Sequence, residues 1–464
     1  MTSPESFAAR FLDCLETHGI PHAVTGPGRL RVEHPDDDVD IVVPADALPR
    51  VGALVARFCA DQGGQLVNAL HHAAGACCFV CVWNDGGRLS CLRLDISGDC
   101  IRAGRLLLPA DEVLQGRGRE GPSGVPVLAP DREFVYLLVK KLEQGILTAR
   151  TAVHLSAQWR EDPAGCRAQL ARFWSGRDAA LLGRAAETLA WRPVRVRLGR
   201  LRRALRRRVP PRWSHRREGL ARLARRLLQP TGTVVALVGP DGAGKTSVVE
   251  RSAAALAPAF QRAVTHHFKP NLLGVTLPAP TTEPGRLGRG PRAGWSPVSG
   301  AKLAYYLCDY WIGYAAKIWP RLVRTSLVLF DRYFDDLGID PVRLHQRGWM
   351  ALAASLRRFV PGPELYLLLD APPAITQARK QEVAPEETAR QRAAFLELIR
   401  GRRNAHVVDA SQPLDDVIAE VQRLVLDHLA RRTARRLGLE PAFRRSDRLS
   451  PAPWRPQSVT RSAE

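Results

Sequence analysis

The sequence predicts an α/β protein with a C-terminal parallel sheet flanked by helices and an N-terminal mixed α/β domain with a helical extension. From residue 233 to about 429, strand and helix patterns alternate, and the first apolar run leads into a glycine-rich loop. A hairpin pattern lies within the first 128 residues, and residues 130–190 show helical periodicity without strand signals. These three observations predict the fold class.

The N-terminal domain, residues 1–128, combines both kinds of element. The expected order is helix 6–17, strand 38–43, helix 48–59, and strands 77–83 and 89–96 around the turn Asn84-Asp85-Gly86-Gly87. A helical subdomain, 129–191, follows with a first helix over 132–144. The chain then continues with a basic linker at 192–230, the parallel-sheet domain at 231–432 and a basic, disordered tail at 433–464.

The net charge of +22 over 464 residues is concentrated in two places. Residues 192–226 hold 15 arginines and one acid, and residues 430–464 hold nine arginines and three acids. Leucines at 198, 201, 205 and at 220, 223, 227 predict two amphipathic helices in the linker. We expect these helices to bury their leucines on a neighbouring domain with the arginines in solvent. The alternative is a weak contact of 192–226 with an anionic surface.

Export and membrane insertion are not expected. The first residues include Glu5 and Asp13, unlike a signal peptide. The longest apolar stretch, 303–316, contains Asp309 and is shorter than the roughly 20 residues of a membrane span. We therefore expect a cytoplasmic protein without a transmembrane segment, with its nine cysteines reduced.

A phosphate-binding loop follows the strand at 234–238. Residues 239–246 fit the pattern G-x-x-x-x-G-K-[ST] directly before a helix at 247–256. Backbone N–H groups at such a helix start bind phosphate oxygens, while Lys245 faces the β and γ phosphates and Thr246 ligates Mg²⁺. The predicted ATP-binding residues are Gly239, Pro240, Asp241, Gly242, Ala243, Gly244, Lys245, Thr246 and Ser247.

A carboxylate at a second strand end complements this loop. The apolar run 327–331 ends in Asp331, and Arg332 and Tyr333 follow. Ligands of open α/β sheets bind at the carboxyl ends of the strands. We expect Asp331 near the Mg²⁺ ion and Arg332 facing a substrate anion; the alternative is a surface salt bridge at a strand end.

These motifs resemble those of thymidylate kinase, a P-loop NTPase-fold nucleoside monophosphate kinase, over residues 233–429. The matching elements are the loop Gly239-x-Asp241-Gly242-x-Gly244-Lys245-Thr246, the triplet Asp331-Arg332-Tyr333, the stretch from Pro363-Glu364 through Leu369-Asp370-Ala371-Pro372-Pro373 to Arg379, and Asp409-Ala410-Ser411. Four ordered matches are more specific than one loop.

The resemblance implies transfer of the ATP γ-phosphoryl group, with Mg²⁺ as cofactor, to a nucleotide-like or other phosphorylated small molecule. It implies that a lid spanning 379–392 brings further arginines to the site. The catalytic residues it implies are Lys245, Asp331, Arg332 and Arg379. The acceptor-binding residues it implies are Asp241, Arg332, Tyr333 and Tyr310.

Departures from the family pattern concern the acceptor. Where the family carries Asp-Arg, whose Arg reads thymine, this chain has Asp309-Tyr310. Acids stand at 335, 336 and 340 after the Asp-Arg-Tyr triplet. The family's Arg-Glu-Pro-Gly segment is either echoed by Thr282-Glu283-Pro284-Gly285, where Thr282 replaces the Arg, or displaced to Lys269-Pro270. Since losing a base-reading group changes specificity, dTMP is doubtful as the acceptor.

A second acidic cluster is expected in the N-terminal domain. Asp38 and Asp40 share one face of a strand, and Asp95 ends another. Three carboxylates at adjacent strand edges can hold Mg²⁺ for nucleotidyl transfer. Residues 1–190 resemble the nucleotidyltransferase fold, but Thr25-Gly26-Pro27-Gly28 lacks the Gly-Ser of active members. An active transferase, a substrate-binding relative and solvated strand-end acids remain alternatives.

The leading hypothesis is thus an ATP-dependent kinase of the thymidylate kinase type. A nucleotidyltransferase that acts on a small molecule or sugar phosphate through the N-terminal domain is the second. The third is a non-catalytic, nucleotide-regulated protein that binds nucleic acid or a membrane surface through 192–226.

Overall fold

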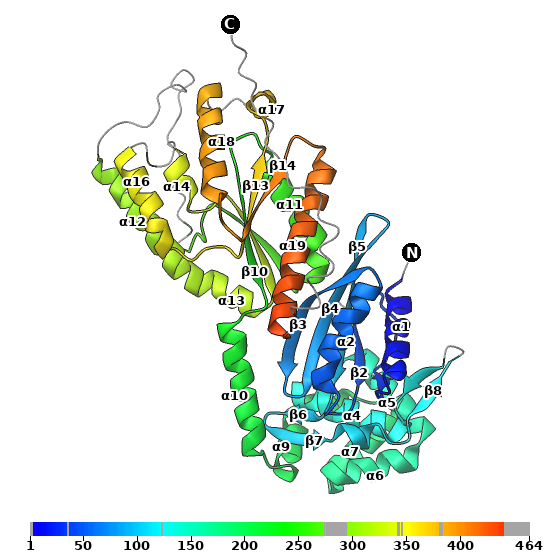
Figure 1. The fold of residues 1–464 in the computed structure, drawn as a ribbon. Helices are drawn as coiled ribbons and strands as arrows, with labels where there is room; N and C mark the ends of the chain where they lie inside the picture. The colour runs from blue at the N-terminus through cyan, green and yellow to red at the C-terminus, as the bar shows by residue number, and fades with distance from the viewer. Residues whose placement is uncertain are drawn as a thin grey trace.

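The computed structural model describes residues 3–34, 37–121, 124–272, 274, 295–340, 344, 347–379 and 384–439. Two sheets, each with flanking helices, lie one above the other in Figure 1, and the helical region packs below the N-terminal sheet. The predicted tail beyond residue 439 and the segment around Thr282 lie outside the described residues.

The C-terminal sheet has five parallel strands, which confirms the predicted parallel-sheet domain. Their order is β11 (Arg262–His267), β12 (Ser326–Asp331), β10 (Thr233–Val238), β13 (Leu365–Asp370) and β14 (Ala405–Asp409). The strands β10, β12 and β13 are buried along their whole length, as expected for apolar runs covered on both faces. Their carboxyl ends therefore meet at one edge of the sheet.

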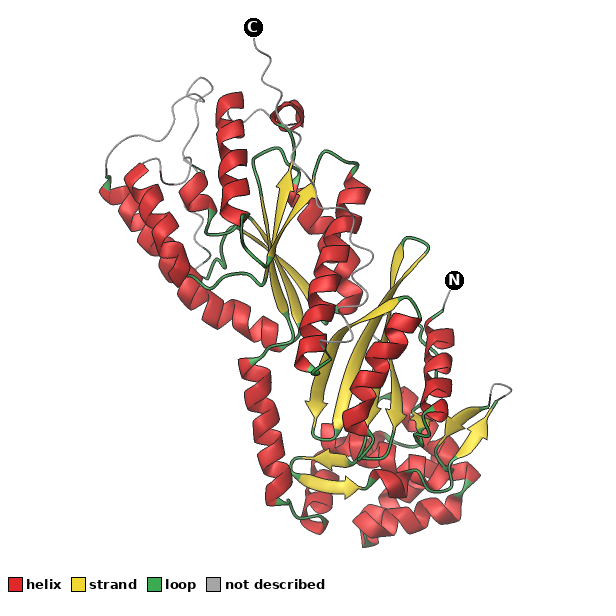
Figure 2. Ribbon diagram, in the orientation of Figure 1, coloured by secondary structure: helices red, strands yellow, loops and turns green. Residues whose placement is uncertain are grey.

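Helices cover both faces of this sheet (Figure 2). Side chains at 235 and 237 of β10 cluster with α11 (Lys245–Leu256) and α19 (Leu414–Arg436). Their neighbours at 234, 236 and 238 cluster with α12 (Pro297–Gly313), α16 (Arg347–Leu356) and α18 (Pro385–Ile399). This alternation is the period-two pattern of a strand between two helical layers.

The N-terminal sheet has seven strands. They are, in spatial order, β3 (Gly64–Ala73), β4 (Ala76–Asp85), β5 (Arg88–Ser97), β2 (Asp38–Val42), β1 (Ala23–Thr25), β9 (Val125–Val127) and β8 (Gly118–Glu120). The predicted hairpin is the antiparallel pair β4–β5, and the predicted helices are α1 (Pro4–Thr17) and α2 (Leu48–Asp61). Strands β1, β3, β8 and β9 have no counterpart among the strands expected from the sequence, and β3 pairs with β4.

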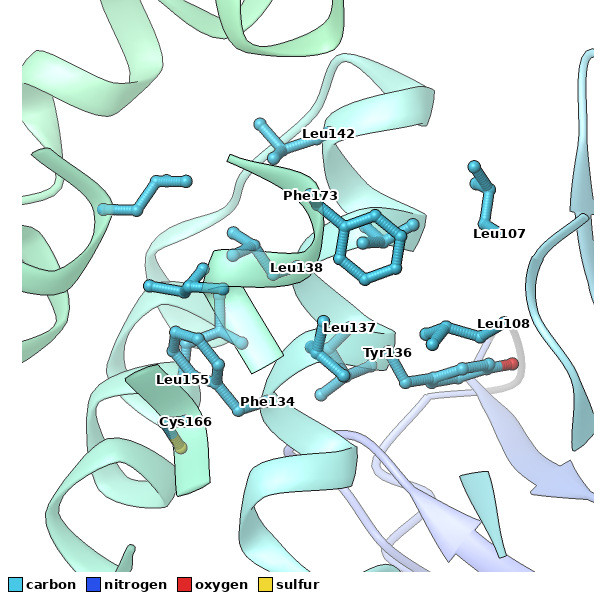
Figure 3. Close-up of a cluster of buried hydrophobic side chains, with 14 of the residues drawn as sticks. Leu107, Leu108, Phe134, Tyr136, Leu137, Leu138, Leu142, Leu155, Cys166 and Phe173 are labelled. Atoms are coloured by element: carbon cyan, nitrogen blue, oxygen red, sulfur yellow. The ribbon is translucent and has the colours of Figure 1, made fainter. Parts of the chain in front are cut away.

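A helical region follows the N-terminal sheet and has its own core (Figure 3). It comprises α4 (Pro130–Gln144), α5 (Ala149–Glu161), α6 (Pro163–Phe173), α7 (Gly176–Thr188), α8 (Arg192–Val196) and α9 (Leu198–Arg208). Phe134, Leu138 and Leu155 are inaccessible to solvent in this core. Truncating one such side chain to alanine costs about 2–5 kcal/mol of stability.

The other elements are short connections. They are β6 (Cys100–Arg102), β7 (Arg105–Leu108), α3 (Ala110–Val113), η1 (Ala257–Ala259), the π-helical turn η2 (Tyr314–Ile318), α13 (Trp319–Val323), α14 (Asp336–Ile339), η3 (Arg357–Phe359) and α17 (Pro373–Arg379). No helix in the described part of the chain has the length and apolar character needed to cross a membrane.

The two basic linker helices differ in what they bury. The expectation of a buried leucine stripe holds for α9, where Leu201 and Leu205 are fully covered. It is wrong for α10 (Trp213–Leu228), where Leu220 is 63% exposed and Leu223 49% exposed. The opposite face of α10 turns inward instead, because Arg222 donates to the His72 carbonyl at 2.9 Å.

Helix α19 joins the two domains into one packed unit. Val67, Val80 and Val82, on the face of the N-terminal sheet away from α1 and α2, share a core cluster with Val425 and Leu429 of α19. Figure 1 shows the lower half of α19 beside β3. The expected domain boundary at residue 432 falls within this helix, which continues to Arg436.

Candidate functional site

The phosphate loop lies between β10 and α11, where its conformation requires glycine. Gly239, Gly242 and Gly244 have φ angles of 147°, 84° and 85°. A Cβ atom on Gly239 would lie 2.6 Å from the Leu369 carbonyl oxygen, and one on Gly242 would lie 2.5 Å from a backbone oxygen of α17. The glycines therefore permit both the turn and its close packing on β13 and α17.

Lys245 folds back onto this loop. Its Nζ donates to the carbonyl oxygens of Gly239 at 2.9 Å and Pro240 at 2.8 Å, and lies 3.5 Å from an Asp241 carboxylate oxygen. Burial and the nearby Arg332 together lower the pKa of Lys245. These carbonyls hold the ammonium group at the place where phosphate oxygens of a bound nucleotide would compete for it.

Thr246 and Asp331 meet at the start of α11. The Thr246 hydroxyl donates to Asp331 Oδ2 at 2.6 Å, while Asp331 Oδ1 is buried and has no hydrogen-bond partner. Burial would raise the pKa of Asp331, but hydrogen bonds from His267 and Thr246 lower it overall, so the carboxylate stays ionised. A hydroxyl and an orphaned carboxylate oxygen are hard oxygen donors that fit Mg²⁺.

His267 is a site residue that sequence reasoning missed. It ends β11, the edge strand beside β12, and its Nδ1 lies 3.4 Å from Asp331 Oδ2. The only available signal was the pair His266-His267 at the end of a strand pattern. Only the register of β11 and β12, which pairs His267 with Asp331, shows that this histidine lies at the site.

Arg332 lies among three carboxylates. It adopts a φ of 73°, a conformation that non-glycine residues seldom take, and its guanidinium contacts Asp241. Asp336 lies 3.3 Å away and Asp340 3.8 Å away. Burial would lower the pKa of Arg332, but Asp336 and Asp241 raise it, so this cation is permanently charged and fixed in place.

The acids around Arg332 make the expected acceptor side negative. Lys245 and Arg332 face four carboxylates, those of Asp241, Asp331, Asp336 and Asp340. Asp335 is separate, because Arg357 and Arg402 pair with it. An anionic acceptor would therefore have to be accompanied by cations at this end of the sheet.

The two tyrosines expected to bind the acceptor are core residues. Tyr310 is fully buried and donates its hydroxyl to the Phe268 carbonyl. Tyr333 is 1% exposed and donates to the Pro361 carbonyl at 2.5 Å. Their rings form an edge-to-face pair with centroids 5.1 Å apart. Because both hydroxyls are bonded and buried, these residues support the site from beneath, which corrects the sequence expectation.

The arginines of the expected lid are bonded away from the phosphate loop. Arg379 donates to the Ala410 carbonyl at 2.9 Å. Arg392 forms two hydrogen bonds with Asp370, at 2.6 and 2.9 Å, and Arg390 pairs with Glu387. The expected catalytic position of Arg379 is thus not formed in this structure, and residues 380–383 of the lid lie outside the described residues.

Asp309, which precedes the position of the family's base-reading arginine, stabilises the backbone of the segment after β11. Asp309 is buried and accepts hydrogen bonds from the backbone N–H groups of Asn271 at 2.9 Å and Leu272 at 2.7 Å. Lys269 Nζ lies 3.9 Å from the same carboxylate and 2.6 Å from the Tyr305 hydroxyl. Lys269 is the cation that this region offers in place of an arginine.

The N-terminal acids also come together. Strands β2 and β5 run parallel, with Asp40 paired to Asp95 and Asp38 paired to Arg93. One carboxylate oxygen from each of Asp38, Asp40 and Asp95 lies within 4.8 Å of the others. Burial and neighbouring carboxylates raise the pKa of Asp38 and of Asp95 to about 6, as expected for clustered acids.

A lysine from the helical region reaches into this cluster. Lys140 Nζ lies 2.7 Å from Asp40 Oδ1 and 3.8 Å from Asp95 Oδ2. Burial would raise the pKa of Asp40, but the Lys140 charge lowers it. The ammonium group therefore already supplies one positive charge where a divalent ion would bind.

The turn that should contact a triphosphate in an active transferase is tied to the protein. Gly26 N–H donates to Glu133 Oε1 at 2.7 Å, and Thr25, Arg29 and His154 also contact this buried carboxylate. Burial would raise the pKa of Glu133, but His154 and Arg29 lower it. Glu133 of α4 thus binds the backbone N–H group of the turn that would bind a phosphate in an active transferase.

The acid cluster opens onto a cavity of about 300 Å³ between the two domains. The N-terminal side contributes Asp38, Asp40, Asp95 and Lys140, and the far wall comes from Phe260, Gln261 and Thr325 of the parallel-sheet domain. Arg93 fixes this wall by donating to the Phe260 carbonyl at 2.9 Å. A ligand at these acids would therefore contact both domains.

Several curated proteins are similar to this chain. The thymidylate kinase of Xanthomonas euvesicatoria pv. vesicatoria (strain 85-10) is 30% identical over 216 residues, which covers 44% of this chain and 88% of that protein. The thymidylate kinases of Xanthomonas campestris pv. campestris (strain B100), 31% identical over 216 residues, and Xanthomonas oryzae pv. oryzae (strain PXO99A), 30% identical over 219 residues, cover the same shares. No protein-family model matches the chain.

The similarity covers most of each relative and less than half of this chain. It supports a kinase region of the nucleotide kinase type, in agreement with the parallel sheet and the phosphate loop described above. Through this region, the chain belongs to the thymidylate kinase family.

Proposed function

We propose that the protein is an ATP-dependent kinase that transfers the γ-phosphoryl group of ATP to a nucleotide-like or other phosphorylated small molecule. One observation carries the proposal: in the first turn of the helix after the phosphate loop, the Thr246 hydroxyl donates to one oxygen of Asp331, and the other oxygen of this carboxylate is buried without a hydrogen-bond partner. Similarity to thymidylate kinases supports the same chemistry. Mg²⁺, held by Thr246 and Asp331, would supply charge neutralisation for the phosphates.

The chain's own groups account for the remaining requirements. An acceptor oxygen attacks the γ-phosphorus, the bond from that phosphorus to its bridging oxygen breaks, and ADP leaves. The backbone N–H groups of the glycine loop bind the phosphates, and Lys245 exchanges its two carbonyl partners for phosphate oxygens. Asp241 and Asp336 hold Arg332 so that its guanidinium faces the acceptor side.

The proposed acceptor differs from dTMP. Tyr310, at the position of the family's base-reading arginine, is buried, and Asp309 beside it accepts hydrogen bonds from backbone N–H groups. The surplus of carboxylates around Arg332 disfavours a bare phosphate dianion. A phosphorylated acceptor that carries its own cationic group, or binds with a divalent ion, matches this charge better.

Release of ADP tests the kinase proposal. A panel of nucleoside monophosphates, sugar phosphates and amino-phosphate compounds is incubated with ATP and Mg²⁺. At least one acceptor should gain phosphate, and Lys245→Ala should reduce the rate at least about 100-fold. Arg251→Ala, which removes an exposed cation from the same helix, serves as the control. Equal rates in wild type and Lys245→Ala would refute the proposal.

We also propose, as a second candidate, a nucleotidyl-transfer or nucleotide-binding role for the N-terminal domain. The convergence of Asp38, Asp40 and Asp95 supports it, whereas the fixed turn at Gly26 favours the binding role. Pyrophosphate release from nucleoside triphosphates, measured with Asp40→Asn and Asp95→Asn together, separates the two roles. Loss of release in this variant supports transfer; binding of a triphosphate without release supports the binding role.

A further inference from the structure

A second cavity lies beside the first and is lined by arginines. Its volume is about 470 Å³, and it is bounded by α10, β3 and the C-terminal end of α19. These three elements converge near the centre of Figure 1. Its charged lining consists of Arg222, Arg225, Arg226 and Arg436 with two histidines, His71 and His72, and no carboxylate lines it among the described residues.

Three of the four arginines of this cavity are held by backbone carbonyls, which do not cancel their charge. Arg222 donates to the carbonyls of His71 and His72, Arg226 to Val323 and Arg436 to Pro230. The Nε of Arg222 is buried without a hydrogen-bond partner. Buried donors without partners cost stability, so an acceptor that reaches them would be bound favourably.

The electrostatic environment agrees with this arrangement. Burial and the adjacent Arg432 lower the pKa of Arg436 to about 10, and burial and Arg226 lower that of Arg222. Burial and nearby cations lower the pKa of His72 to about 4, so this histidine is neutral at pH 7. Four like charges in a cavity with no carboxylate in its described lining repel one another, and a bound polyanion would relieve this repulsion.

The orientation of α10 gives an independent indication. Its leucines at 220, 223 and 227 face solvent, while its arginines at 222 and 226 face the cavity. Burying leucine would gain about 1.5–3 kcal/mol per side chain, so placing arginine inward needs a compensating interaction. Hydrogen bonds from Arg222 and Arg226 to backbone carbonyls supply part of it, and a ligand of the cavity would add to it.

We propose that this arginine cavity is a binding site for a small organic polyphosphate, distinct from the phosphate loop. A volume of about 470 Å³ is in the range for a molecule of nucleotide size. Guanidinium groups bind phosphate oxygens through paired, charge-assisted hydrogen bonds. Leu70, His72 and Gln261 line both cavities, so a ligand held by the arginines reaches toward the acid cluster.

The proposal does not rest on kinase activity, since no cavity residue belongs to the phosphate loop. Inorganic tripolyphosphate is the probe, and amide hydrogen exchange measured by mass spectrometry on full-length protein is the readout. At ten times the dissociation constant, exchange over 213–228 and 68–72 should slow by up to about tenfold. The Lys245→Ala variant should show the same protection, which separates this site from the phosphate loop.

The variant Arg225→Gln with Arg436→Gln tests the two walls of the cavity. Tripolyphosphate binding, measured by calorimetry in the Lys245→Ala background, should weaken at least about tenfold. Arg207→Gln with Arg217→Gln removes two exposed arginines of the same basic segment that line no described cavity, and should stay within about twofold. Circular dichroism checks that both variants are folded.

Three outcomes would overturn the proposal. They are the absence of protection over α10 and β3, equal weakening in the control pair, and protection by single-stranded DNA but not by tripolyphosphate. The last result would assign the arginines to a nucleic acid.

Discussion

The two domains each place a lysine beside a strand-end carboxylate, but the two lysines do different things. Lys245 bonds to carbonyls of its own loop and leaves one oxygen of Asp331 without a partner. Lys140 bonds directly to Asp40 at 2.7 Å. The first arrangement keeps both a cation and an acid available to a ligand. The second uses the cation to neutralise Asp40, although Asp95 Oδ1 of the same cluster also lacks a hydrogen-bond partner.

The two sites therefore differ in how far their charged groups are already paired within the protein. In the parallel-sheet domain, binding of the proposed nucleotide and Mg²⁺ would compensate the cost of an unpartnered carboxylate oxygen. In the N-terminal domain, Lys140 and Glu133 satisfy groups that would otherwise face a triphosphate. The parallel-sheet site is thus prepared for a ligand, and the N-terminal site has first to release internal contacts.

The largest expected effect concerns Asp331. Asp331→Asn should lower phosphoryl transfer about 100- to 1,000-fold, because it removes the charge that faces the metal and the nucleotide. Steady-state ADP release with the acceptor found in the panel measures this effect. Asp415→Asn, which changes a carboxylate that is 80% exposed, is the control. A loss of less than threefold would show that Asp331 lies away from the reacting phosphates.

The next effect is on stability and concerns Glu133. Glu133→Gln should lower the free energy of unfolding of the N-terminal domain by about 3 kcal/mol, since it leaves Arg29 and His154 without their buried counter-charge. Urea unfolding followed by circular dichroism measures it. Glu187→Gln, at an exposed position of α7, should change stability by less than about 0.5 kcal/mol. An equal change in both variants would contradict the role of Glu133 as the anchor of the turn.

The contrast between the lysines predicts a gain of function. Lys140→Met should tighten Mn²⁺ binding at the acid cluster at least about tenfold, because a competing positive charge next to Asp40 is removed. Electron paramagnetic resonance of free Mn²⁺ gives the dissociation constant. Lys141→Met changes a neighbouring lysine of the same cavity and should have a smaller effect. If Lys140→Met weakens Mn²⁺ binding, the lysine assists the ion instead of replacing it.

The smallest expected effect is at a contact between α19 and the residue before β13, within the parallel-sheet domain. Glu364 accepts hydrogen bonds from His428 and Arg432 of α19; burial would raise the pKa of Glu364, but these two partners lower it overall. Its contribution, about 1 kcal/mol, is present above its ordinary pKa of 4.5 and is lost as the pH falls through the lowered value.

Glu364→Gln should therefore reduce stability at pH 7 and have little effect near pH 3. Thermal unfolding at both pH values measures the difference. A loss of equal size at pH 3 would mean that packing, and not ionisation, accounts for the effect.

Much of the parallel-sheet domain could be predicted from sequence because its signals are local. The loop pattern, the apolar strands and the placement of Asp331 depend on short stretches, and the structure brings Lys245, Thr246 and Asp331 together. His267 escaped prediction because a histidine at an edge strand has no pattern of its own. The sequence led to the expectation that Tyr310 and Tyr333 bind the acceptor, because it does not show that nearby carbonyls already bind their hydroxyls.

The basic linker shows that short sequence patterns predict a helix but not which of its faces is buried. Leucine spacing predicts an amphipathic helix at 213–228, and that helix is present. Which face is covered depends on what stands opposite, and β3 and α19 present carbonyl groups and a cavity to the arginines. An expectation based on apolar burial alone therefore failed for α10 and held for α9.

The sequence by itself determined most of the long elements, the phosphate loop and the three N-terminal acids, since these depend on periodicity and on residue types at fixed spacing. Only the tertiary structure decided that Lys140 neutralises Asp40, that three acids surround Arg332 and that four arginines share a cavity between the domains. These contacts join residues far apart in the chain, and their energies depend on distance and burial, which no local pattern contains.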